Sequence, residues 1–314
     1  MHPAMNAPVP SIAPVTATGP ANSATPASSA LSAARKADAN SILKKKMHTA
    51  VLTGKRIFAG GRMGVFTLRP TDGERCWFEA GQYVTLGLDT PDGFVPRPYS
   101  FAGSPLDAGF EFFVALVEGG KLTPTFFQQE IGATFHYLSP KGRFTLRNAG
   151  KPTVVMVATG TGLAPFVSQI RSLWKLHRSG VRVPHRMVLF HGCAHADEFG
   201  YREELLTYAA AREDGFDLTC VFTASRPDPA RHWSPQIGKG RVNELVRLML
   251  GQPVNATREI ALPEGLTAEG LRALIDPAQT AVLACGNPGM LEDIKEPVAH
   301  TGIATYLVEE YWKA

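Results

Sequence analysis

The stretch "VVMVATGTGLAPF", residues 154–166, joins a continuous apolar segment to a glycine-rich turn and the start of a helix. Gly160 and Gly162 allow the backbone of the turn to approach a ligand closely, and Pro165 suits a first helical turn. A helix N-terminus favours anions, so the stretch indicates the first strand–turn–helix unit of a nucleotide-binding sheet. Pro165 replaces the third glycine of the usual dinucleotide fingerprint, and the turn alone is also compatible with a simple tight connection.

The rest of the second half repeats this alternation of strands and helices. Apolar runs of strand length are separated by segments with helical spacing, such as Phe166, Ile170 and Leu173. This order predicts a doubly wound parallel α/β sheet over residues 151–314, in which the carboxyl ends of the strands line one crevice. Glycine, threonine, serine, arginine and cysteine cluster at three more of those ends, in segments 191–193, 223–226 and 285–288.

The first half has a different rhythm. Between residues 47 and 150, short runs rich in β-branched and aromatic residues are bounded by glycine, proline and aspartate, which predicts an antiparallel β-barrel. The expected strands include "HTAVLTGKRI", "GVFTLRP", "QYVTLGL", "EFFVALV" and "GRFTL", with one helix around "TPTFFQQEI". Residues 1–46 form an Ala/Pro/Ser-rich tail that ends in the basic "LKKK", and we expect this tail to be disordered.

Composition and charge argue against several classes of function. The net charge of +4 is too small to indicate nucleic acid, and no apolar run approaches the roughly 20 residues of a membrane span. The four cysteines are too widely spaced for a metal or cluster site and favour a reducing compartment, so we expect no metal and a cytoplasmic location. Residues 1–150 hold 15 Lys/Arg against 10 Asp/Glu, which suits an acidic partner, although solubility alone would also account for it.

Six motifs stand out along residues 47–314: "RPYS" at 97–100, "GGKLTPTF" at 119–126, "GTGLAP" at 160–165, "GKGRVNELV" at 238–246, "CGNPGM" at 285–290 and "VEEYW" at 308–312. Together, and in this order, they resemble the ferredoxin–NADP⁺ reductase family, and more closely its bacterial flavodoxin/ferredoxin–NADP⁺ reductase branch. The resemblance implies an FAD-binding barrel in residues 47–150 and an NADP(H)-binding α/β domain in residues 151–314.

The resemblance assigns the barrel motifs to FAD. Arg97 would neutralise the FAD pyrophosphate, Tyr99 would stack beside the flavin or its ribityl chain, and Ser100 would hydrogen-bond near flavin nitrogen 5. Thr123 would offer its hydroxyl and backbone amides to the same pyrophosphate, or would simply cap a helix. The FAD set implied by the motifs is Arg97, Pro98, Tyr99, Ser100, Gly120, Lys121, Leu122, Thr123, Tyr311 and Trp312.

The sheet motifs are implied to bind NADP(H). Ser225, Arg226 and Arg241 would meet the 2′-phosphate, because two guanidinium groups and a hydroxyl suit a dianion. Relatives often carry a further arginine where this chain has Ala194, which weakens the preference for NADPH over NADH. The NADP(H) set implied is Thr159, Gly160, Thr161, Gly162, Ser225, Arg226, Arg241, Cys285 and Gly286.

The catalytic residues implied are Ser100, Cys285, Glu309 and Tyr311. Cys285 and Glu309 would place the nicotinamide over the flavin, while Tyr311 would cover the flavin ring and Trp312 would stack on the FAD adenine. Each also has a plainer interpretation, as a buried structural cysteine or a packed chain end.

The function implied is an FAD-dependent exchange of electrons between NADP(H) and a separate ferredoxin or flavodoxin. Hydride transfer to flavin nitrogen 5 would precede one-electron steps. The sequence leaves two alternatives open: an NAD(P)H-dependent flavin or oxygenase-component reductase, and a non-catalytic flavin- or nucleotide-binding regulator. We expect a monomer that binds neither nucleic acid nor a membrane.

Overall fold

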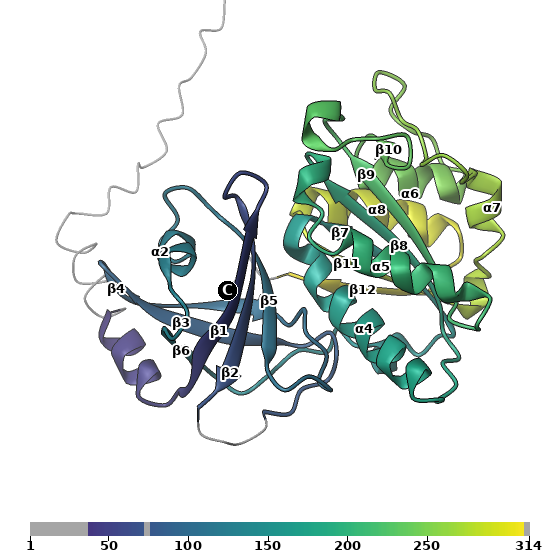
Figure 1. Cartoon of the computed structure of the whole chain (residues 1–314). Helices are drawn as coiled ribbons and strands as arrows, with labels where there is room; N and C mark the ends of the chain where they lie inside the picture. Colours follow the sequence, from purple (N-terminus) through teal and green to yellow (C-terminus); the bar gives the residue numbers. More distant parts are fainter. Residues whose placement is uncertain (1–36, 72–75, 311–314) are drawn as a thin grey trace, which may run out of the picture. The chain divides into compact units, whose positions relative to one another are not determined.

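The structure is a computed structural model that describes residues 37–71 and 76–310. Six antiparallel strands make up the first sheet: β1 (His48–Phe58), β2 (Met63–Pro70), β3 (Tyr83–Thr90), β4 (Gly93–Ser100), β5 (Phe110–Ala115) and β6 (Thr134–Tyr137). Their spatial order is β4-β3-β6-β1-β2-β5, and a bridge between Phe101 and Phe112 joins the two ends of the sheet. The predicted antiparallel barrel is confirmed (Figure 1).

Aromatic side chains fill the interior of this barrel. Phe66 meets Phe126 with ring centres 4.6 Å apart, and Phe126 lies 4.8 Å from Phe135; all three rings are fully buried. Phe126 comes from helix α2 (Thr123–Gln128), which is the helix predicted around "TPTFFQQEI". Burial of such rings is a large hydrophobic contribution, so α2 is held against the strands by its phenylalanine.

Three local predictions need comment. The predicted strand "GRFTL" is wrong, because Thr145 accepts a hydrogen bond from Asn148 N and starts the short helix α3 (Leu146–Ala149) there. Strands β4 and β6 were not among those expected. Of the tail predicted to be disordered, residues 37–44 are helical, and residues 1–36 lie outside the described residues.

The second sheet has the strands β7 (Thr153–Thr159), β8 (Arg186–Cys193), β9 (Leu218–Ala224), β10 (Gly238–Lys239), β11 (Thr280–Cys285) and β12 (Thr305–Glu309). All pair in parallel, in the order β10-β9-β8-β7-β11-β12. The chain builds outward from β7 to β10 and then crosses back to β11, so the order reverses between β7 and β11. Ligands of doubly wound sheets bind at such a switch point, and the predicted sheet type is confirmed.

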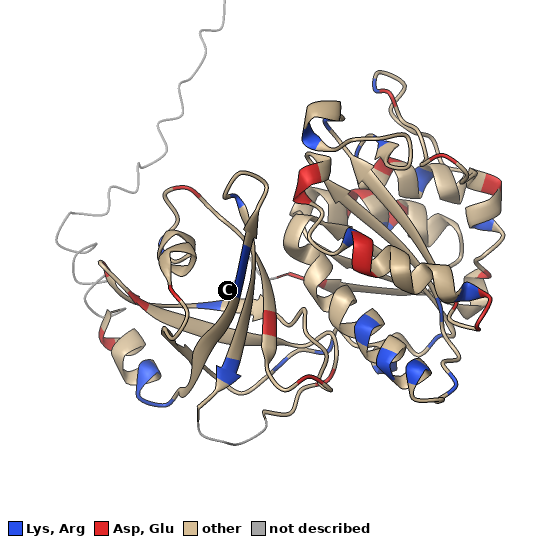
Figure 2. Cartoon of the chain, viewed as in Figure 1, with Lys and Arg blue, Asp and Glu red and all other residues tan. Residues whose placement is uncertain are grey.

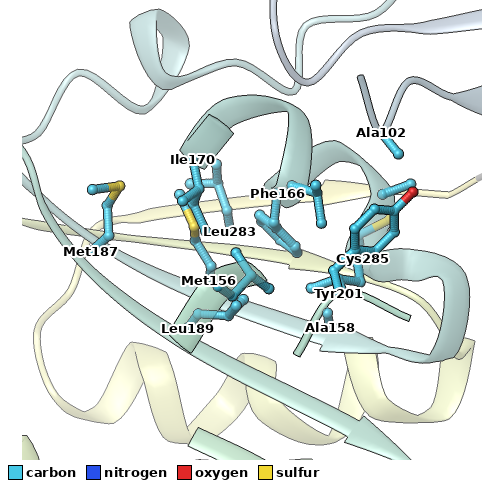
Figure 3. Packing of buried hydrophobic residues seen from close by; sticks show 14 of the residues in the cluster. Ala102, Met156, Ala158, Phe166, Ile170, Met187, Leu189, Tyr201, Leu283 and Cys285 are labelled. Carbon is cyan, nitrogen blue, oxygen red and sulfur yellow. The ribbon is translucent and has the colours of Figure 1, made fainter. Parts of the chain in front are cut away.

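Helices cover both faces of this sheet. The helices are α4 (Ala164–Arg178), α5 (Arg202–Ala209), α6 (Val242–Leu250), α7 (Ala268–Arg272) and α8 (Pro288–His300). Helices α4 and α5 pack on the face that carries Met156, and α6, α7 and α8 pack on the face that carries Val155. Figure 3 shows Phe166 and Ile170 of α4 on the first face, close to Leu283.

Helix α4 begins immediately after the glycine-rich turn. That turn forms a short 3₁₀ segment, η1 (Gly160–Leu163), and Pro165 lies in the first turn of α4 as expected. The last turn of α4 carries Lys175 and Arg178, and Figure 2 shows basic positions in blue along this part of the helix. This polarity complements the helix dipole, so anions are favoured at the turn and disfavoured at the far end.

Candidate functional site

A cavity of about 400 Å³, here called the barrel pocket, opens beside the end of β4. Most of its lining comes from the barrel, and Thr161 and Ala164 come from the turn and helix that follow β7. Every described residue of the predicted FAD set lines it: Arg97, Pro98, Tyr99, Ser100, Gly120, Lys121, Leu122 and Thr123. The structure therefore brings together two motifs that lie about twenty residues apart in the sequence, and adds the glycine-rich turn to them.

In the barrel pocket, one buried hydroxyl lacks a hydrogen-bond partner and one half-buried cation lacks a carboxylate, over the part of the chain that the structure describes. The Ser100 Oγ atom is buried and makes no hydrogen bond within the described residues. Arg97 donates to the Pro96 carbonyl at 2.7 Å, and no carboxylate in residues 37–71 or 76–310 pairs with it. A buried unsatisfied hydroxyl is costly, so a hydrogen-bonding group that enters this pocket is favoured. An anionic, flat group such as FAD fits this chemistry.

Tyr99 forms the aromatic wall of the pocket. Its ring lies 5.5 Å from Phe126 and 6.4 Å from Phe112, centre to centre, and these contacts fix its plane. Burial raises the pKa of Tyr99 well above its usual value, while the nearby Arg97 charge opposes this effect more weakly. Tyr99 is therefore a neutral stacking surface at any physiological pH.

The Thr123 hydroxyl already makes two hydrogen bonds within its own loop. Its hydroxyl accepts from Val117 N at 2.9 Å and donates to Val117 O at 3.2 Å, so it closes the loop over residues 117–123. Thr123 is the first residue of α2, and the N-cap position belongs to Leu122, whose side chain caps nothing. Its single hydroxyl proton is used, so a phosphate oxygen would have to be met by other groups of this loop.

A second cavity of about 330 Å³, here called the sheet pocket, lies at the carboxyl ends of the parallel strands. Register pairing places Thr159 opposite Gly192, and Ala158 opposite Cys285, so these strand ends are neighbours. The lining residues are Thr159, Gly160, Gly192, Cys193, Ala194, Glu198, Ser225, Arg241, Val242, Asn243, Asn287, Gly289, Met290 and Asp293. Gly160 lines the sheet pocket and its neighbour Thr161 lines the barrel pocket, so the glycine-rich turn connects the two.

Two glycines of the predicted NADP(H) set permit close contacts between different segments. A Cβ on Gly162 would lie 2.3 Å from the Cys285 carbonyl oxygen, so this glycine permits close packing of two strand ends. Gly286 has a φ of 137°, and a Cβ there would lie 2.1 Å from Thr159 Oγ1. The same Thr159 Oγ1 accepts from Asn287 N at 2.6 Å. Thr159 and Gly286 thus tie the two nucleotide motifs to one another.

The predicted 2′-phosphate residues are placed unequally. Ser225 and Arg241 line the sheet pocket with exposed side chains, and Arg241 precedes helix α6. Arg226 is also exposed but is not part of the pocket lining; its backbone N donates to Ala194 O at 2.9 Å. Of the two predicted arginines, only Arg241 therefore lines the sheet pocket.

Sequence reasoning missed Glu198 in the sheet pocket. Its Oε2 accepts from Ala194 N at 3.1 Å and from His195 N at 3.3 Å, while Oε1 lies 3.4 Å from Arg62 and 3.6 Å from Arg231. Glu198 accepts from the His195 backbone as the acidic residue of a capping box does, but histidine is not a residue type that signals an N-cap in the sequence. Glu198 holds the loop at Ala194 in place.

His191 was also missed, although it stands at the end of β8. Its Nε2 lies 3.0 Å from the Gly160 carbonyl oxygen, which can only accept, so Nε2 carries the proton. The ring is fully buried between Phe199 and Phe222. Burial lowers the pKa of His191 to about 4, with the Gly160 hydrogen bond opposing, so this imidazole is neutral.

Cys285 and Glu309 are register partners on β11 and β12. The Cys285 side chain is fully buried in the core between α4 and the sheet, and burial together with Glu309 raises its thiol pKa. Burial raises the pKa of Glu309 to about 7. Cys285 lines neither pocket in the described part of the chain, and the predicted residues Tyr311 and Trp312 lie outside the described residues.

The described residues contain neither a membrane-spanning helix nor a group of metal-binding side chains. Within residues 37–71 and 76–310, no helix is both long and apolar enough to span a membrane. Across the same ranges, His, Cys, Asp and Glu side chains form no group that could hold a metal ion.

Comparisons with known proteins match both halves of the chain. Residues 55–146 match the family model described as oxidoreductase FAD-binding domain, and residues 156–296 match the one described as oxidoreductase NAD-binding domain. Ferredoxin–NADP reductase B of Sorangium cellulosum is 36% identical over 184 residues, which cover 57% of this chain and 71% of that protein.

Other relatives come from oxygenase systems. The ferredoxin–NAD(P)⁺ reductase component of the naphthalene 1,2-dioxygenase/salicylate 5-hydroxylase systems of a Ralstonia species is 32% identical over 72% of this chain, but the match spans only 57% of that longer protein. Among solved structures, a ferredoxin NADP⁺ reductase from Neisseria gonorrhoeae with bound FAD and NADP has a TM-score of 0.65 at 19% identity. That likeness covers 84% of this chain and 98% of the other, and it shows a shared fold.

Proposed function

The chain belongs to the ferredoxin–NADP⁺ reductase family of FAD- and NADP(H)-binding oxidoreductases, and from this premise we propose that it exchanges electrons between NADP(H) and a ferredoxin or flavodoxin. One observation carries the proposal. Ser100 from the barrel and Thr161 from the nucleotide turn line the same cavity, so a group seated on β4 meets a group held by the turn. Such contact is what electron-pair transfer between two cofactors requires.

FAD, when bound, supplies the conversion between two-electron transfer with a nicotinamide and one-electron transfer with a carrier protein. The chain's own residues would bind and orient it. Arg97 and Lys121 place positive charge where a pyrophosphate is expected, Tyr99 offers a flat face, and Ser100 offers an unsatisfied hydroxyl to the flavin edge. The apolar lining from Phe113 to Ala115 excludes water from the site of transfer.

The sheet pocket would hold the nucleotide. The first turn of η1 and α4 presents backbone N–H groups at the positive end of a helix dipole, which suits a pyrophosphate. Ser225 and Arg241 at the outer side of the pocket suit the 2′-phosphate of NADP(H). Gly160 and Thr161 lie between the two, so a nucleotide laid over this turn would reach the barrel pocket.

Replacement of the 2′-phosphate candidates tests the nucleotide assignment. We expect Arg241→Ala to raise the KM for NADPH about tenfold or more and Arg226→Ala to raise it less, because only Arg241 lines the pocket. The KM for NADH should stay within twofold in both variants, and Arg143→Ala, an exposed arginine of the barrel segment that is not part of the sheet-pocket lining, serves as the control. Equal losses for NADPH and NADH would contradict the assignment.

The choice of carrier is a separate part of the proposal. Relatives named ferredoxin–NADP reductase and flavodoxin/ferredoxin–NADP reductase favour ferredoxin or flavodoxin, and relatives named as dioxygenase and phenol 2-monooxygenase reductase components favour an oxygenase as the alternative. Steady-state turnover with NADPH and, in turn, ferredoxin, flavodoxin and free flavin separates them. Fastest turnover with free flavin at equal concentration would overturn the carrier assignment.

The cellular compartment and the oligomeric state are also part of the proposal. All four cysteines are unbridged, which fits a reducing compartment, and we propose the cytoplasm. We also propose a monomer, which size-exclusion chromatography with light scattering would test.

A further inference from the structure

One face of helix α4 carries three small residues at a spacing of four. Ala164 lines the barrel pocket, Ser168 follows one turn later, and Ser172 one turn after that. Ser168 is completely buried and Ser172 is 8% exposed. Buried serines inside a helix usually bond to the helix's own backbone, so the partners of these hydroxyls are informative.

Both hydroxyls are part of a link to the barrel. Ser168 Oγ donates to the Gly103 carbonyl oxygen at 2.6 Å. Ser172 Oγ donates to the Ser168 carbonyl oxygen at 2.6 Å and lies 2.8 Å from Ser104 Oγ. A hydroxyl has one proton, so Ser104 is the donor in the serine–serine contact. Every proton in this link is therefore accounted for.

Few residues separate this serine link from the barrel pocket, both along the barrel segment after β4 and along helix α4. Gly103 and Ser104 follow Ser100, at the end of β4, by three and four residues, and Ala102 and Phe101 between them are completely buried. Ser168 lies one helical turn from Ala164 and two turns from Thr161, which both line the barrel pocket. Close-packed segments of this length transmit a shift rather than absorb it.

Arg171, on the same helix, makes a different kind of contact. Its guanidinium lies 2.8 Å from Glu111 of the barrel, but it also makes two bonds, of 2.7 and 2.8 Å, to Glu204 on α5. A long side chain can follow a small movement of the barrel by changing rotamer. A serine hydroxyl, one carbon from the backbone, cannot, so the Ser168 contact holds two backbones at one separation.

We propose that Ser168 is a positioning residue, whose hydrogen bond to Gly103 sets the separation between a flavin seated against β4 and a dinucleotide held by the turn at Gly160–Leu163. This inference rests on the proposed function. Ser168→Ala would leave a buried carbonyl unsatisfied and would let the RPYS segment drift from α4. A misplacement of about 1 Å can slow transfer about 100-fold, while each cofactor keeps its own contacts.

The test uses the full chain loaded with FAD. Stopped-flow reduction of the flavin at saturating NADPH, without oxygen, is compared for the wild type, Ser168→Ala and the control Ser179→Ala. Ser179 Oγ bonds only within α4, to Leu176 O at 2.7 Å. We expect Ser168→Ala to be reduced about tenfold more slowly, with the Kd values for FAD and NADP⁺ within twofold of wild type, and Ser179→Ala to match wild type.

A second readout does not depend on activity. Amide hydrogen exchange of the full chain without FAD should rise together in segments 101–104 and 161–164 of Ser168→Ala and stay unchanged in Ser179→Ala. If Ser168→Ala does not fold, Ser172→Ala takes its place, because it removes the acceptor of Ser104 and the bond to the Ser168 carbonyl but keeps the Ser168 side chain. A reduction rate at least threefold slower with unchanged Kd values would support the proposal, and a wild-type rate would overturn it.

The remaining outcomes are decisive as well. A Ser168→Ala rate within twofold of wild type would overturn the positioning role, as would a loss of FAD or NADP⁺ affinity as large as the loss of rate. If NADPH reduces the wild type normally, such a result removes this inference and leaves the proposed function in place. If NADPH does not reduce the wild type at all, both are overturned.

Discussion

The two pockets differ in how their polar groups are satisfied. In the barrel pocket, Ser100 Oγ has no partner and Arg97 has no carboxylate within the described ranges. In the sheet pocket, Thr159 accepts from Asn287 N, and Glu198 accepts from two backbone amides. The barrel pocket is thus completed by what it binds, whereas the sheet pocket is held in shape by its own bonds. This contrast suits a resident FAD and a nucleotide that comes and goes.

The largest effect is expected from Gly286→Ala, which should distort the sheet pocket and leave the barrel pocket unchanged. Gly286→Ala forces a side chain into a left-handed backbone position and against Thr159, where a Cβ would lie 2.1 Å from Oγ1. We expect kcat/KM for NADPH to fall at least about 100-fold, while the ratio of FAD to protein in the absorption spectrum stays at the wild-type value. Gly302→Ala is the control, because Gly302 also has a positive φ, of 80°, but no atom of the described residues other than its chain neighbours lies within 4 Å of the added Cβ. A matching loss of FAD from Gly286→Ala would contradict the independence of the pockets.

The next effect concerns the free energy of unfolding of the protein at acid pH, to which the buried His191 contributes. Between pH 6.5 and 4 the unfolded chain protonates His191 while the folded chain keeps it neutral, so the unfolded state binds more protons and stability falls as the pH falls. The difference in pKa corresponds to about 3 kcal/mol of unfolding free energy. His191→Gln keeps a donor for Gly160 but does not titrate, so urea unfolding should show a flatter pH dependence below 6.5.

His300→Gln is the control for that experiment, since His300 is exposed. Its pH dependence should follow the wild type. If His191→Gln and His300→Gln have the same slope, His191 is not held neutral by burial.

The smallest expected effect sharpens the description of the barrel pocket. Arg97→Ala removes a cation that no carboxylate neutralises within the described residues, and a charge-assisted bond to phosphate contributes about 1.5–3 kcal/mol. We expect the Kd for FAD to rise by about 10- to 100-fold in fluorescence titrations of stripped protein. After reconstitution with excess FAD, the KM for NADPH should be unchanged. Arg143→Ala, an exposed arginine of the same barrel segment, should bind FAD normally.

The members of the barrel pocket were largely predictable, because local motifs carry them, whereas only Thr159, Gly160, Ser225 and Arg241 of the predicted NADP(H) set line the sheet pocket. The strand–turn–helix stretch at 154–166 formed as its pattern indicated, and all described FAD candidates gathered in one cavity. The strand predicted at "GRFTL" failed, because one threonine cap outweighed a weak strand pattern. His191 and Glu198 escaped notice, because a lone histidine or glutamate at a strand end gives little signal until its partner is known.

What the sequence determined by itself is the two fold types and most of the elements in them, together with candidate residues for each ligand, because hydrophobic period, turn chemistry and motif spacing are all local. Only the tertiary structure decided which of these side chains remain without a hydrogen-bond partner in the protein and can therefore bond to a ligand. It engaged Thr123 and Thr159 with backbone groups, left Ser100 without a partner, and joined Ser168 to Gly103 across 65 positions of the chain. The reason is physical: a hydrogen bond depends on distance and direction in space, and no local pattern encodes either for residues so far apart.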